Sequence, residues 1–204
     1  MLGVRDVDVV GVVSKTKQSA EDTAALANEL GVGPAKAFDT ITEMVEDPGV
    51  DALWVCSPNY TRIETFEEIA NAVSSSKGEL IGVACEKPLG RNVAEAKKVL
   101  ELTQSADLLD GYLENQVFSP SITRGKEIIW ARGAATTGRP FLARAAEEHS
   151  GPHMPWFWEG ELQGGGVLND MMCHSVEEAR FLLTEPGKPR DSIKPISVSA
   201  HTDC

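Results

Sequence analysis

Residues 79–88 read ELIGVACEKP, an apolar run that ends abruptly at a glutamate, a lysine and a proline. A short continuous apolar run predicts a strand that is buried on both faces, as in a parallel sheet. Residues 92–106, NVAEAKKVLELTQSA, follow with apolar side chains at helical spacing. A strand and a helix of these lengths are typical of βαβ units. This stretch therefore predicts an α/β fold built on a parallel sheet.

The same alternation of strand and helix extends on both sides of this unit. We expect further strands over residues 7–13, 35–38, 50–58 and 108–116, and further helices over 19–33, 39–47 and 61–76. Asp39 is the expected N-cap of the helix over 39–47, because its short acidic side chain can accept a hydrogen bond from the first turn.

The pattern changes beyond residue 117, where we expect a domain boundary. The second part is predicted to contain, in order, a helix over 119–140, a strand over 141–150, a loop over 151–166, a helix over 167–184 and a strand over 193–201. Polar and apolar side chains alternate over 141–150, which is typical of a strand in an antiparallel sheet.

Composition excludes several classes of partner and location. The 204 residues carry 19 basic and 31 acidic side chains, a net charge of −12, and no basic run offsets this acidity. A nucleic-acid partner is therefore not expected. Arg5, Asp6 and Asp8 stand where a signal peptide needs an apolar core, and no apolar run approaches the length of a membrane span. We expect a cytoplasmic protein that binds no membrane.

The cysteines indicate an intracellular protein as well. Cys56, Cys85, Cys173 and Cys204 form no C-x-x-C pair and lie mostly in apolar surroundings. This pattern indicates reduced thiols rather than a disulfide framework.

Lys87 is the first candidate for chemistry. It follows a predicted buried strand, and the carboxyl ends of parallel strands form the edge where doubly wound sheets bind ligands. A partly desolvated lysine there can hydrogen-bond a substrate hydroxyl and favour its deprotonation. Glu86 either pairs with it or caps the loop, and Pro88 is a candidate for a cis peptide bond. The alternative is an ordinary solvated lysine before a proline turn.

A second candidate lies in GGGVLNDMMCHSVEE, residues 164–178. Asp170 and His174 are spaced so that they share one face of the predicted helix. Asp170 can orient the imidazole or stabilise its charge, and a histidine readily accepts a proton near neutral pH. The alternatives are a surface pair, or a buried histidine satisfied by a carboxylate.

Two further features of this region are weaker candidates. A metal site would need ligands such as His149 or His153, but no ligand spacing matches a known metal motif, and we expect no metal. Trp156 and Trp158 could line a sugar or cofactor pocket, although such clusters more often anchor a loop in the core.

The turn that would hold a dinucleotide pyrophosphate is missing from the sequence. Such a turn, G-x-G-x-x-G, joins a strand to the N-terminus of a helix. The run GVGP at 31–34 follows a predicted helix, and QGGG at 163–166 has no strand before it. The chain begins as if one βα unit were lacking.

Three motifs together resemble one family. CEKPL at 85–89, GGGVLNDMMCHSVE at 164–177 and DALWVCSPNYTR at 51–62 resemble the Gfo/Idh/MocA oxidoreductases, the superfamily of glucose-fructose oxidoreductase and inositol dehydrogenase. The resemblance runs over essentially the whole chain. It implies a Rossmann-like dinucleotide-binding domain at 1–117, without its first strand and glycine-rich turn. It also implies an incomplete second α/β domain at 118–204, with a mainly antiparallel open sheet that serves substrate binding and oligomerisation.

The resemblance also implies an activity, the transfer of a hydride between NAD(P) and a hydroxyl carbon of a sugar or polyol. Carried over by residue, Lys87 matches the lysine of the family's E-K-P motif and would polarise the oxygen. Asp170 and His174 match the acid and the histidine of the second-domain motif, with His174 as the general base. Trp156 is the further substrate-contact candidate. A homo-oligomer is expected of the complete protein, because the family's large sheet commonly forms a dimer face.

The cofactor residues follow from the same comparison. The turn Ser57-Pro58-Asn59 matches the family's turn over the cofactor, although Arg62 stands where many members have histidine, and Glu86 lies beside Lys87 at the cofactor edge. The strand over 7–13 ends at Ser14, Lys15 and Thr16, where NAD-preferring members usually place an acidic residue on the ribose. Ser and Lys would instead attract a 2′-phosphate, which favours NADP over NAD.

Two alternatives to an active dehydrogenase remain open. One is a catalytically silent NAD(P)-binding regulator, which would need none of the three catalytic candidates. The other is a fragment that does nothing alone, because lacking the first strand leaves both of its neighbours unpaired at the centre of the sheet.

Overall fold

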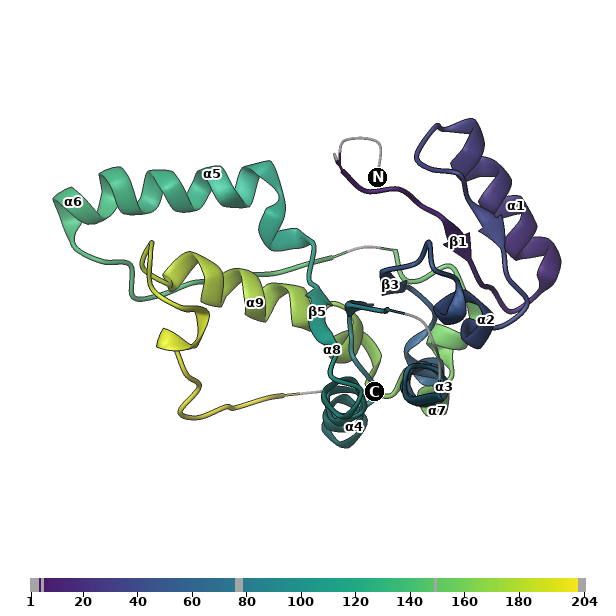
Figure 1. Cartoon of the computed structure of the whole chain (residues 1–204). Coiled ribbons are helices and arrows are strands. Elements are labelled where there is room, and N and C mark those ends of the chain that lie inside the picture. Colours follow the sequence, from purple (N-terminus) through teal and green to yellow (C-terminus); the bar gives the residue numbers. More distant parts are fainter. Residues whose placement is uncertain (1–3, 5, 76–78, 149, 202–204) are drawn as a thin grey trace. The chain divides into compact units, whose positions relative to one another are not determined.

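The computed structural model describes residues 4, 6–75, 79–148 and 150–201. These residues form two compact units, whose helices and strands are labelled in Figure 1. The first unit consists of Met1–Leu113 together with Glu159–Gly164, and the second of Glu114–Trp158 together with Gly165–Cys204. The segment Glu159–Gly164 therefore belongs to the first unit, although the chain reaches it only after the second unit has begun.

Strands and helices alternate in the first unit, and every strand pair is parallel. The elements are β1 (Gly11–Val12), α1 (Lys17–Glu29), β2 (Lys36–Ala37), α2 (Ile41–Glu46), β3 (Ala52–Val55), η1 (Asn59–Thr61), α3 (Arg62–Ser75), β4 (Gly82–Glu86), α4 (Val93–Ser105), β5 (Leu109–Leu113) and α7 (Gly160–Gln163). The predicted α/β class is confirmed. The strands are shorter than the apolar runs from which they were predicted.

The start of α2 differs from the prediction. Thr40 Oγ1 accepts a hydrogen bond from the backbone N–H of Glu43 at 3.0 Å, and the Glu43 carboxylate accepts one from the backbone N–H of Asp39 at 3.1 Å. The prediction of Asp39 as N-cap is wrong, because this reciprocal arrangement, similar to a capping box, makes Thr40 the cap.

The strands form two separate sheets. β1 pairs with β2, and β3, β4 and β5 lie in that order in a second sheet. Val10, directly before β1, packs against the core of the second sheet, so the two sheets are neighbours. Among the described residues, β1 and β3 each pair on one side only. The break between the two sheets therefore lies between β1 and β3.

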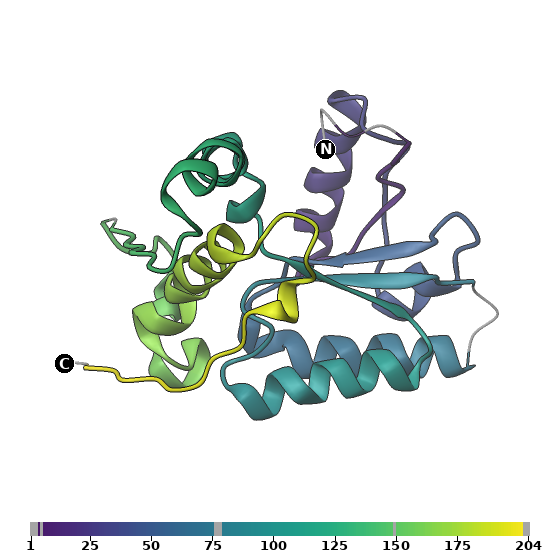
Figure 2. The ribbon, with the colours of Figure 1, turned by 90° about the vertical axis from the view of Figure 1, so that its left-hand side faces the viewer.

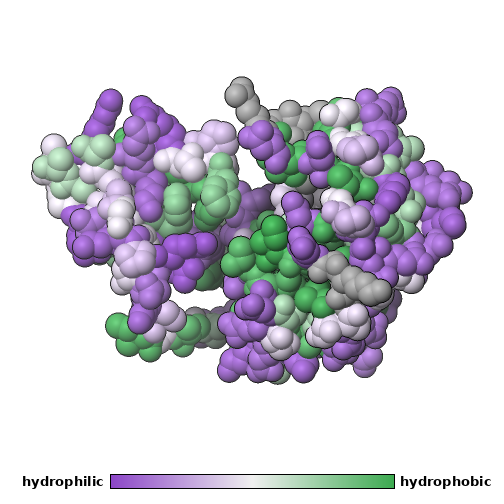
Figure 3. Space-filling view, in the orientation of Figure 1, coloured by the Kyte–Doolittle hydropathy of each residue, from purple (hydrophilic) through white to green (hydrophobic). Residues whose placement is uncertain are grey.

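One face of the three-stranded sheet is covered and the other is largely open. Figure 2 shows α3 and α4 side by side along the covered face. The core there consists mainly of Leu53, Val55, Val83 and Cys85 from the strands, Phe66, Ile69 and Ala72 from α3, and Val99 from α4. Side chains alternate between the faces of a strand, and on the other face Trp54 is 53% and Leu109 71% exposed. Figure 3 shows hydrophobic side chains at the surface over these strands.

The second unit is helical in its described residues. Its elements are η2 (Gln116–Phe118), α5 (Pro120–Ile128), the π-helical η3 (Ile129–Gly133), α6 (Ala134–Thr137), η4 (Pro155–Trp158), α8 (Gly166–Asp170), α9 (Met172–Leu183) and η5 (Arg190–Ser192). Helices α5 to α6 confirm the predicted helix over 119–140. The indole N–H of Trp130 donates to the Leu182 carbonyl at 2.9 Å, which joins this helix to α9.

Two strands predicted for the second unit are wrong. No described residue of 141–150 or 193–201 forms a strand; Phe141 is 91% and Ile196 99% exposed. The described residues of this unit contain no strand to which either segment could pair, and an extended segment without a partner gains neither ladder hydrogen bonds nor cross-strand contacts. Across the described parts of the whole chain, no helix combines the length and apolar character needed to cross a membrane.

Candidate functional site

Lys87 lies at the carboxyl edge of the three-stranded sheet, directly after β4. It is half-buried, and the peptide bond to Pro88 is cis. The guanidinium of Arg62, which is 1% exposed, donates hydrogen bonds to the carbonyl oxygens of Val55 at 2.9 Å and Glu86 at 3.1 Å. Because these residues end β3 and β4, Arg62 ties the two strand ends together and fixes the backbone from which Lys87 extends.

The thiols at this edge are poor candidates for chemistry. Burial raises the pKa of the Cys85 thiol to about 11, and burial is also the main reason that the pKa of Cys56 is raised. Both thiols are therefore protonated near neutral pH, and a protonated thiol is a poor nucleophile. Cys56, Cys85 and Cys173 carry no disulfide, while Cys204 lies outside the described residues.

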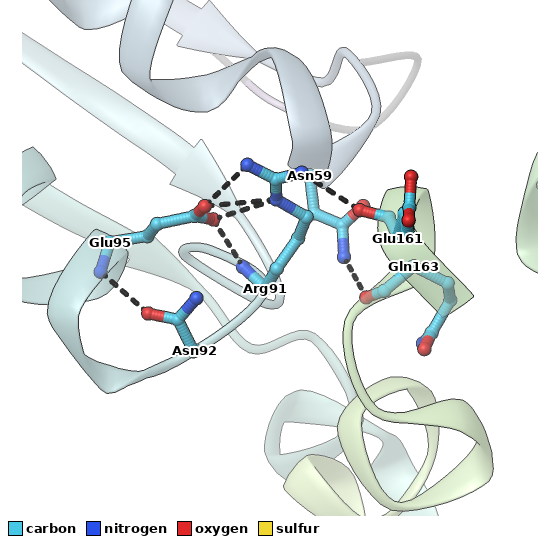
Figure 4. A network of polar contacts seen from close by, with 6 residues as sticks. All are labelled: Asn59, Arg91, Asn92, Glu95, Glu161 and Gln163. Carbon is cyan, nitrogen blue, oxygen red and sulfur yellow. Dashed lines mark hydrogen bonds and ion pairs between the residues drawn. The ribbon is translucent and has the colours of Figure 1, made fainter. Parts of the chain in front are cut away.

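The turn Ser57-Pro58-Asn59 follows β3 at the same edge. Thr61 stabilises it, since its hydroxyl makes hydrogen bonds to Ser57 Oγ at 2.9 Å and to the Pro58 carbonyl at 2.7 Å. Asn59 is 3% exposed, and its Nδ2 donates to the Gln163 carbonyl at 2.8 Å (Figure 4). Asn59 Oδ1 is buried and has no hydrogen-bond partner among the described residues, so the part of the chain that the structure describes leaves this acceptor unused.

A second polar contact holds α7 on the first unit, as Figure 4 shows. Arg91 donates from Nη1 to the Glu161 carbonyl at 2.8 Å and from Nη2 to Glu95 Oε1 at 2.6 Å. The Arg91 hydrogen bonds lower the pKa of Glu95. Together with the Asn59–Gln163 bond, this contact attaches α7 to the turn after β3 and to the start of α4.

Ser14, Lys15 and Thr16 follow β1 and are all exposed. Thr16 Oγ1 caps α1 by accepting from the backbone N–H of Ser19 at 3.2 Å, and Ser14 Oγ donates to Ser19 Oγ at 3.1 Å. Lys15 directly precedes Thr16, the N-cap of α1, and a helix N-terminus favours an anion.

These observations allow a test of whether the chain fits NAD(P). The exposed Lys15 next to the α1 N-terminus suits a phosphate-bearing ribose, and the buried acceptor of Asn59 suits a polar group of the cofactor. No described strand is followed by a glycine-rich turn. The residues present thus offer polar groups that suit parts of a dinucleotide, and the described strands lack the glycine-rich turn that usually binds its pyrophosphate.

In the second unit, His174 pairs with Glu114. His174 Nδ1 lies 2.6 Å from Glu114 Oε1, and the two residues are 4% and 2% exposed. The backbone N–H of Gln116 donates to the same oxygen at 3.0 Å. Sequence reasoning missed Glu114; the available signal was a glutamate directly after β5, one position beyond Leu113, which pairs with Glu86 of β4.

Two more carboxylates belong to this cluster. Gln116 Nε2 donates to Glu147 Oε1 at 3.0 Å. Burial raises the pKa of Glu178, and the negative charges of Glu147 and Glu114 raise it further, while His174 acts in the opposite direction. The buried imidazole is therefore surrounded by acidic groups, one of which holds a proton more tightly than an ordinary glutamate does.

The predicted continuous helix over 167–184 is interrupted. α8 ends at Asp170 and α9 begins at Met172, so Asp170 and His174 do not share one helix face as the spacing predicted. The break lies at Met171, where φ is −105° and ψ is −38°. Cys173 Sγ donates to the Asp170 carbonyl at 3.2 Å across this break.

The tryptophans lie before α7. Trp156 is half-buried and stacks on Phe157, with ring centroids 3.7 Å apart, whereas Trp158 is 72% exposed. The role of Trp156 in substrate binding stays a prediction.

One group of potential metal ligands contains a hydrogen-bonded pair that is too close for two ligands of one zinc ion. Glu114, Cys173 and His174 each offer a ligand atom, all within 4.8 Å of one another. The 2.6 Å between His174 Nδ1 and Glu114 Oε1 is shorter than the roughly 3.3 Å that separates two ligands of a tetrahedral zinc at ordinary bond lengths. His149 lies outside the described residues, and His153 is exposed.

The predicted residues thus fall into three places. Ser14, Lys15 and Thr16 follow β1; the turn 57–59 and the pair 86–87 lie at the carboxyl ends of β3 and β4; Trp156, Asp170 and His174 belong to the second unit.

Comparison with known proteins gives a consistent result for both units. Residues 2–110 match the family described as "Oxidoreductase family, NAD-binding Rossmann fold", and residues 133–202 match "GFO/IDH/MocA C-terminal domain". The two matches together cover most of the chain.

Individual relatives are similar to this chain over part of their length. A 1,5-anhydro-D-fructose reductase of Ensifer adhaerens is 31% identical, over 85% of this chain and 49% of its own. A myo-inositol 2-dehydrogenase of Thermotoga maritima is 30% identical, over 76% of this chain and 42% of its own. The crystal structure of GenD2 from gentamicin A biosynthesis, in complex with NAD, superposes with a TM-score of 0.70 at 27% identity, covering 88% of this chain and 47% of that one. The chain spans about half the length of these relatives.

Proposed function

Because the chain belongs to the Gfo/Idh/MocA oxidoreductase family, we propose that it carries the catalytic residues of an NAD(P)-dependent sugar or polyol dehydrogenase. The observation that carries the proposal is Lys87, half-buried at the carboxyl edge of a parallel sheet and extending from a backbone that the buried Arg62 fixes. Doubly wound sheets bind their ligands at this edge. The relatives named for work on inositol and on an anhydro sugar support a polyhydroxylated substrate.

Each residue has a defined part in the reaction. When bound, the nicotinamide accepts the hydride that leaves the substrate carbon. Lys87 donates a hydrogen bond to the oxygen on that carbon, which stabilises the negative charge that develops there. His174 takes the hydroxyl proton as the C=O bond forms, and Asp170 favours the imidazolium by its charge. A phosphate-bearing ribose would be bound by Ser14 and Lys15, which gives a preference for NADP.

The first test is loss of activity in the complete protein. We expect Lys87→Ala and His174→Ala each to lower turnover about a hundredfold or more, measured as NADP⁺ or NAD⁺ reduction with myo-inositol and D-glucose, and as NADPH oxidation with 1,5-anhydro-D-fructose. Lys98→Ala and His201→Ala, which replace exposed residues of the same types, should leave turnover unchanged. Full activity in either catalytic variant would refute the assignment.

The second test concerns the cofactor. Titration of the chain with NADPH and NADH, followed by nicotinamide fluorescence, should give saturable binding that is tighter for NADPH. Lys15→Ala should reduce that difference, whereas exposed Lys17→Ala, in the first turn of α1, should affect binding less. If neither nucleotide binds, the described residues cannot hold the dinucleotide without a glycine-rich turn that binds its pyrophosphate.

The alternative of a chain that is inactive alone is favoured by one observation, the open apolar face with Trp54 and Leu109. Together with the unpaired edges of β1 and β3, this face invites association. Gel filtration separates the two cases: a discrete small oligomer agrees with the proposed enzyme, and heterogeneous aggregates agree with the inactive chain. A silent regulator would instead bind nucleotide and show no turnover with any of these substrates.

A further inference from the structure

We propose that Glu114 is a positioning residue for His174, which it holds as the Nδ1–H tautomer so that Nε2 is the nitrogen that accepts the substrate proton. The contact that supports this assignment is the 2.6 Å separation of His174 Nδ1 and Glu114 Oε1. Both side chains are more than nine-tenths buried. The tautomer is inferred from this contact together with the hydrogen bond that the backbone N–H of Gln116 donates to the same oxygen, whereas the role of Nε2 as the base rests on the proposed function.

The hydrogen-bond pattern indicates which partner is the donor. An ionised carboxylate can only accept hydrogen bonds, and a neutral imidazole has one N–H and one lone pair. Glu114 Oε1 already acts as an acceptor, because the backbone N–H of Gln116 donates to it at 3.0 Å, and an oxygen of a charged carboxylate forms the stronger bond to a ring N–H. Nδ1 is then the nitrogen that carries the hydrogen, and the lone pair is left on Nε2.

The surrounding acidic groups fit this charge distribution. Burial and the charges of Glu147 and Glu114 raise the pKa of Glu178, so this carboxyl takes up a proton more readily than an ordinary glutamate does. Glu147 receives a neutral amide donor from Gln116. Proton uptake at Glu178 removes the negative charge that this carboxyl group would otherwise add beside Glu114.

The chemical consequence is a balanced proton transfer. The substrate O–H bond breaks and a bond from hydrogen to Nε2 forms, while the hydride leaves the same carbon with its electron pair. The imidazole becomes an imidazolium, and its Nδ1–H faces the Glu114 carboxylate, which stabilises the new positive charge. Glu114 touches neither substrate nor cofactor in this scheme, and it acts only through His174.

Glu114→Gln is a well-matched variant, because Glu114 Oε2 is buried without a hydrogen-bond partner among the described residues. The amide oxygen can still accept from Nδ1–H and from Gln116, and the NH₂ group replaces an atom that made no bond. Glu114→Gln should therefore keep the tautomer, whereas Glu114→Ala removes the acceptor and should lose it.

The decisive measurement is the histidine tautomer in the 204-residue chain, read from long-range ¹H–¹⁵N NMR correlations of ¹⁵N-histidine-labelled protein with a metal chelator present. His174→Gln assigns the signal. We expect the neutral His174 ring to be protonated at Nδ1 in the wild type and in Glu114→Gln. In Glu114→Ala we expect a mixture or the Nε2–H form. Glu185→Gln, which changes an exposed glutamate after α9, should change nothing.

Two results in the wild type would overturn the proposal: an Nε2–H tautomer, or an imidazolium that persists from about pH 6 to 9, the range in which histidine ordinarily changes charge. The wild-type measurement stands even if Glu114→Ala fails to fold. In the complete enzyme, Glu114→Ala should lower kcat by about tenfold or more, within the usual size of a proton-transfer contribution, with little change in the KM for the cofactor.

The inference and the proposed function can fail separately. An Nδ1–H tautomer together with full activity of His174→Ala would refute His174 as the base and leave the Glu114 assignment of the tautomer intact. An Nε2–H tautomer together with loss of activity in His174→Ala would refute the role of Glu114 and leave the proposed function standing.

Discussion

The two units differ in the balance of apolar and polar side chains that they bury. In the first unit the core is apolar, made by side chains of the sheet and of the helices that cover it. In the second unit the buried described residues include Glu114, His174, Ser175 and Thr184, with Val117 as the buried apolar residue. The first unit is thus held mainly by non-directional burial, and the second to a greater degree by specific polar pairs.

This difference has an energetic meaning. Burial of apolar area contributes in proportion to the area removed from water and tolerates small changes of geometry. A buried polar group contributes only if its partner is in place, and it is costly when the partner is removed. Substitutions in the two units should therefore change the free energy of unfolding by different amounts, and these changes should depend on pH to different degrees.

The largest effect is expected from the apolar core. Ile69 of α3 is 2% exposed, and Ile69→Ala should lower the free energy of unfolding by about 2–5 kcal/mol through lost burial and the cavity left behind. Ile81, which is 58% exposed, supplies the matched control, and Ile81→Ala should cost much less. Urea unfolding followed by circular dichroism measures both. Equal losses would contradict the view that burial in the apolar core, and not the type of side chain, sets the cost of Ile69→Ala.

Local sequence patterns predicted most of the first unit. β-Branched runs and helical spacing located its strands and helices, because both signals depend on neighbours along the chain. Strand length was overestimated: the run over 7–13 yields only Gly11–Val12, since a residue counts as strand only where a partner pairs with it. The same reason explains the failure over 141–150 and 193–201.

The candidate site was predictable in part. Lys87 could be found because its signal is local, a lysine at the end of an apolar run. Glu114 could not, because its pairing with His174 joins residues 60 positions apart, and the Asn59–Gln163 bond spans 104 positions. Such contacts depend on how the elements pack. The break at Met171 was also missed, since residues on both sides of it have helical spacing.

The next largest loss of stability is expected where α7 attaches to the rest of the first unit. Gly164 has φ +94°, and a Cβ there would lie 2.4 Å from the Cβ of Arg91. Gly164→Ala should destabilise this attachment by more than about 1 kcal/mol, because both the backbone conformation and the space favour glycine. Hydrogen exchange should then be faster for the backbone N–H groups of Leu162 and Gly164, which bond within α7.

The control for this change lies in the same short helix. A Cβ at Gly160 would meet no atom within 4 Å, so Gly160→Ala should leave exchange in α7 unchanged or slower. Unchanged exchange in Gly164→Ala would show that the bonds from Asn59 and Arg91 are not what holds the segment.

The smallest change in stability is expected from a substitution of Glu178. Unlike the two changes above, it should make the folded chain more stable. Burial and two neighbouring carboxylates raise its pKa above the ordinary 4.5, so its charged form is unfavourable in the folded chain. Well below pH 4.5 the Glu178 carboxyl is protonated in the folded and in the unfolded chain, so it does not change the free energy of unfolding. As the pH rises from there toward the raised pKa of the folded chain, the carboxyl ionises in the unfolded chain first, and the folded state loses stability. Glu178→Gln cannot ionise, and it should therefore raise the melting temperature at neutral pH by a small amount that disappears in acid.

Thermal unfolding at several pH values tests this sign, with Glu185→Gln as the exposed control that should show no such gain. A polar cluster that tolerates its own charges would give the reverse result, with Glu178→Gln less stable than the wild type at neutral pH. The favourable outcome would show that the second unit gives up stability to keep acidic groups around His174. This is the expected cost of holding a base next to a carboxylate in a buried site.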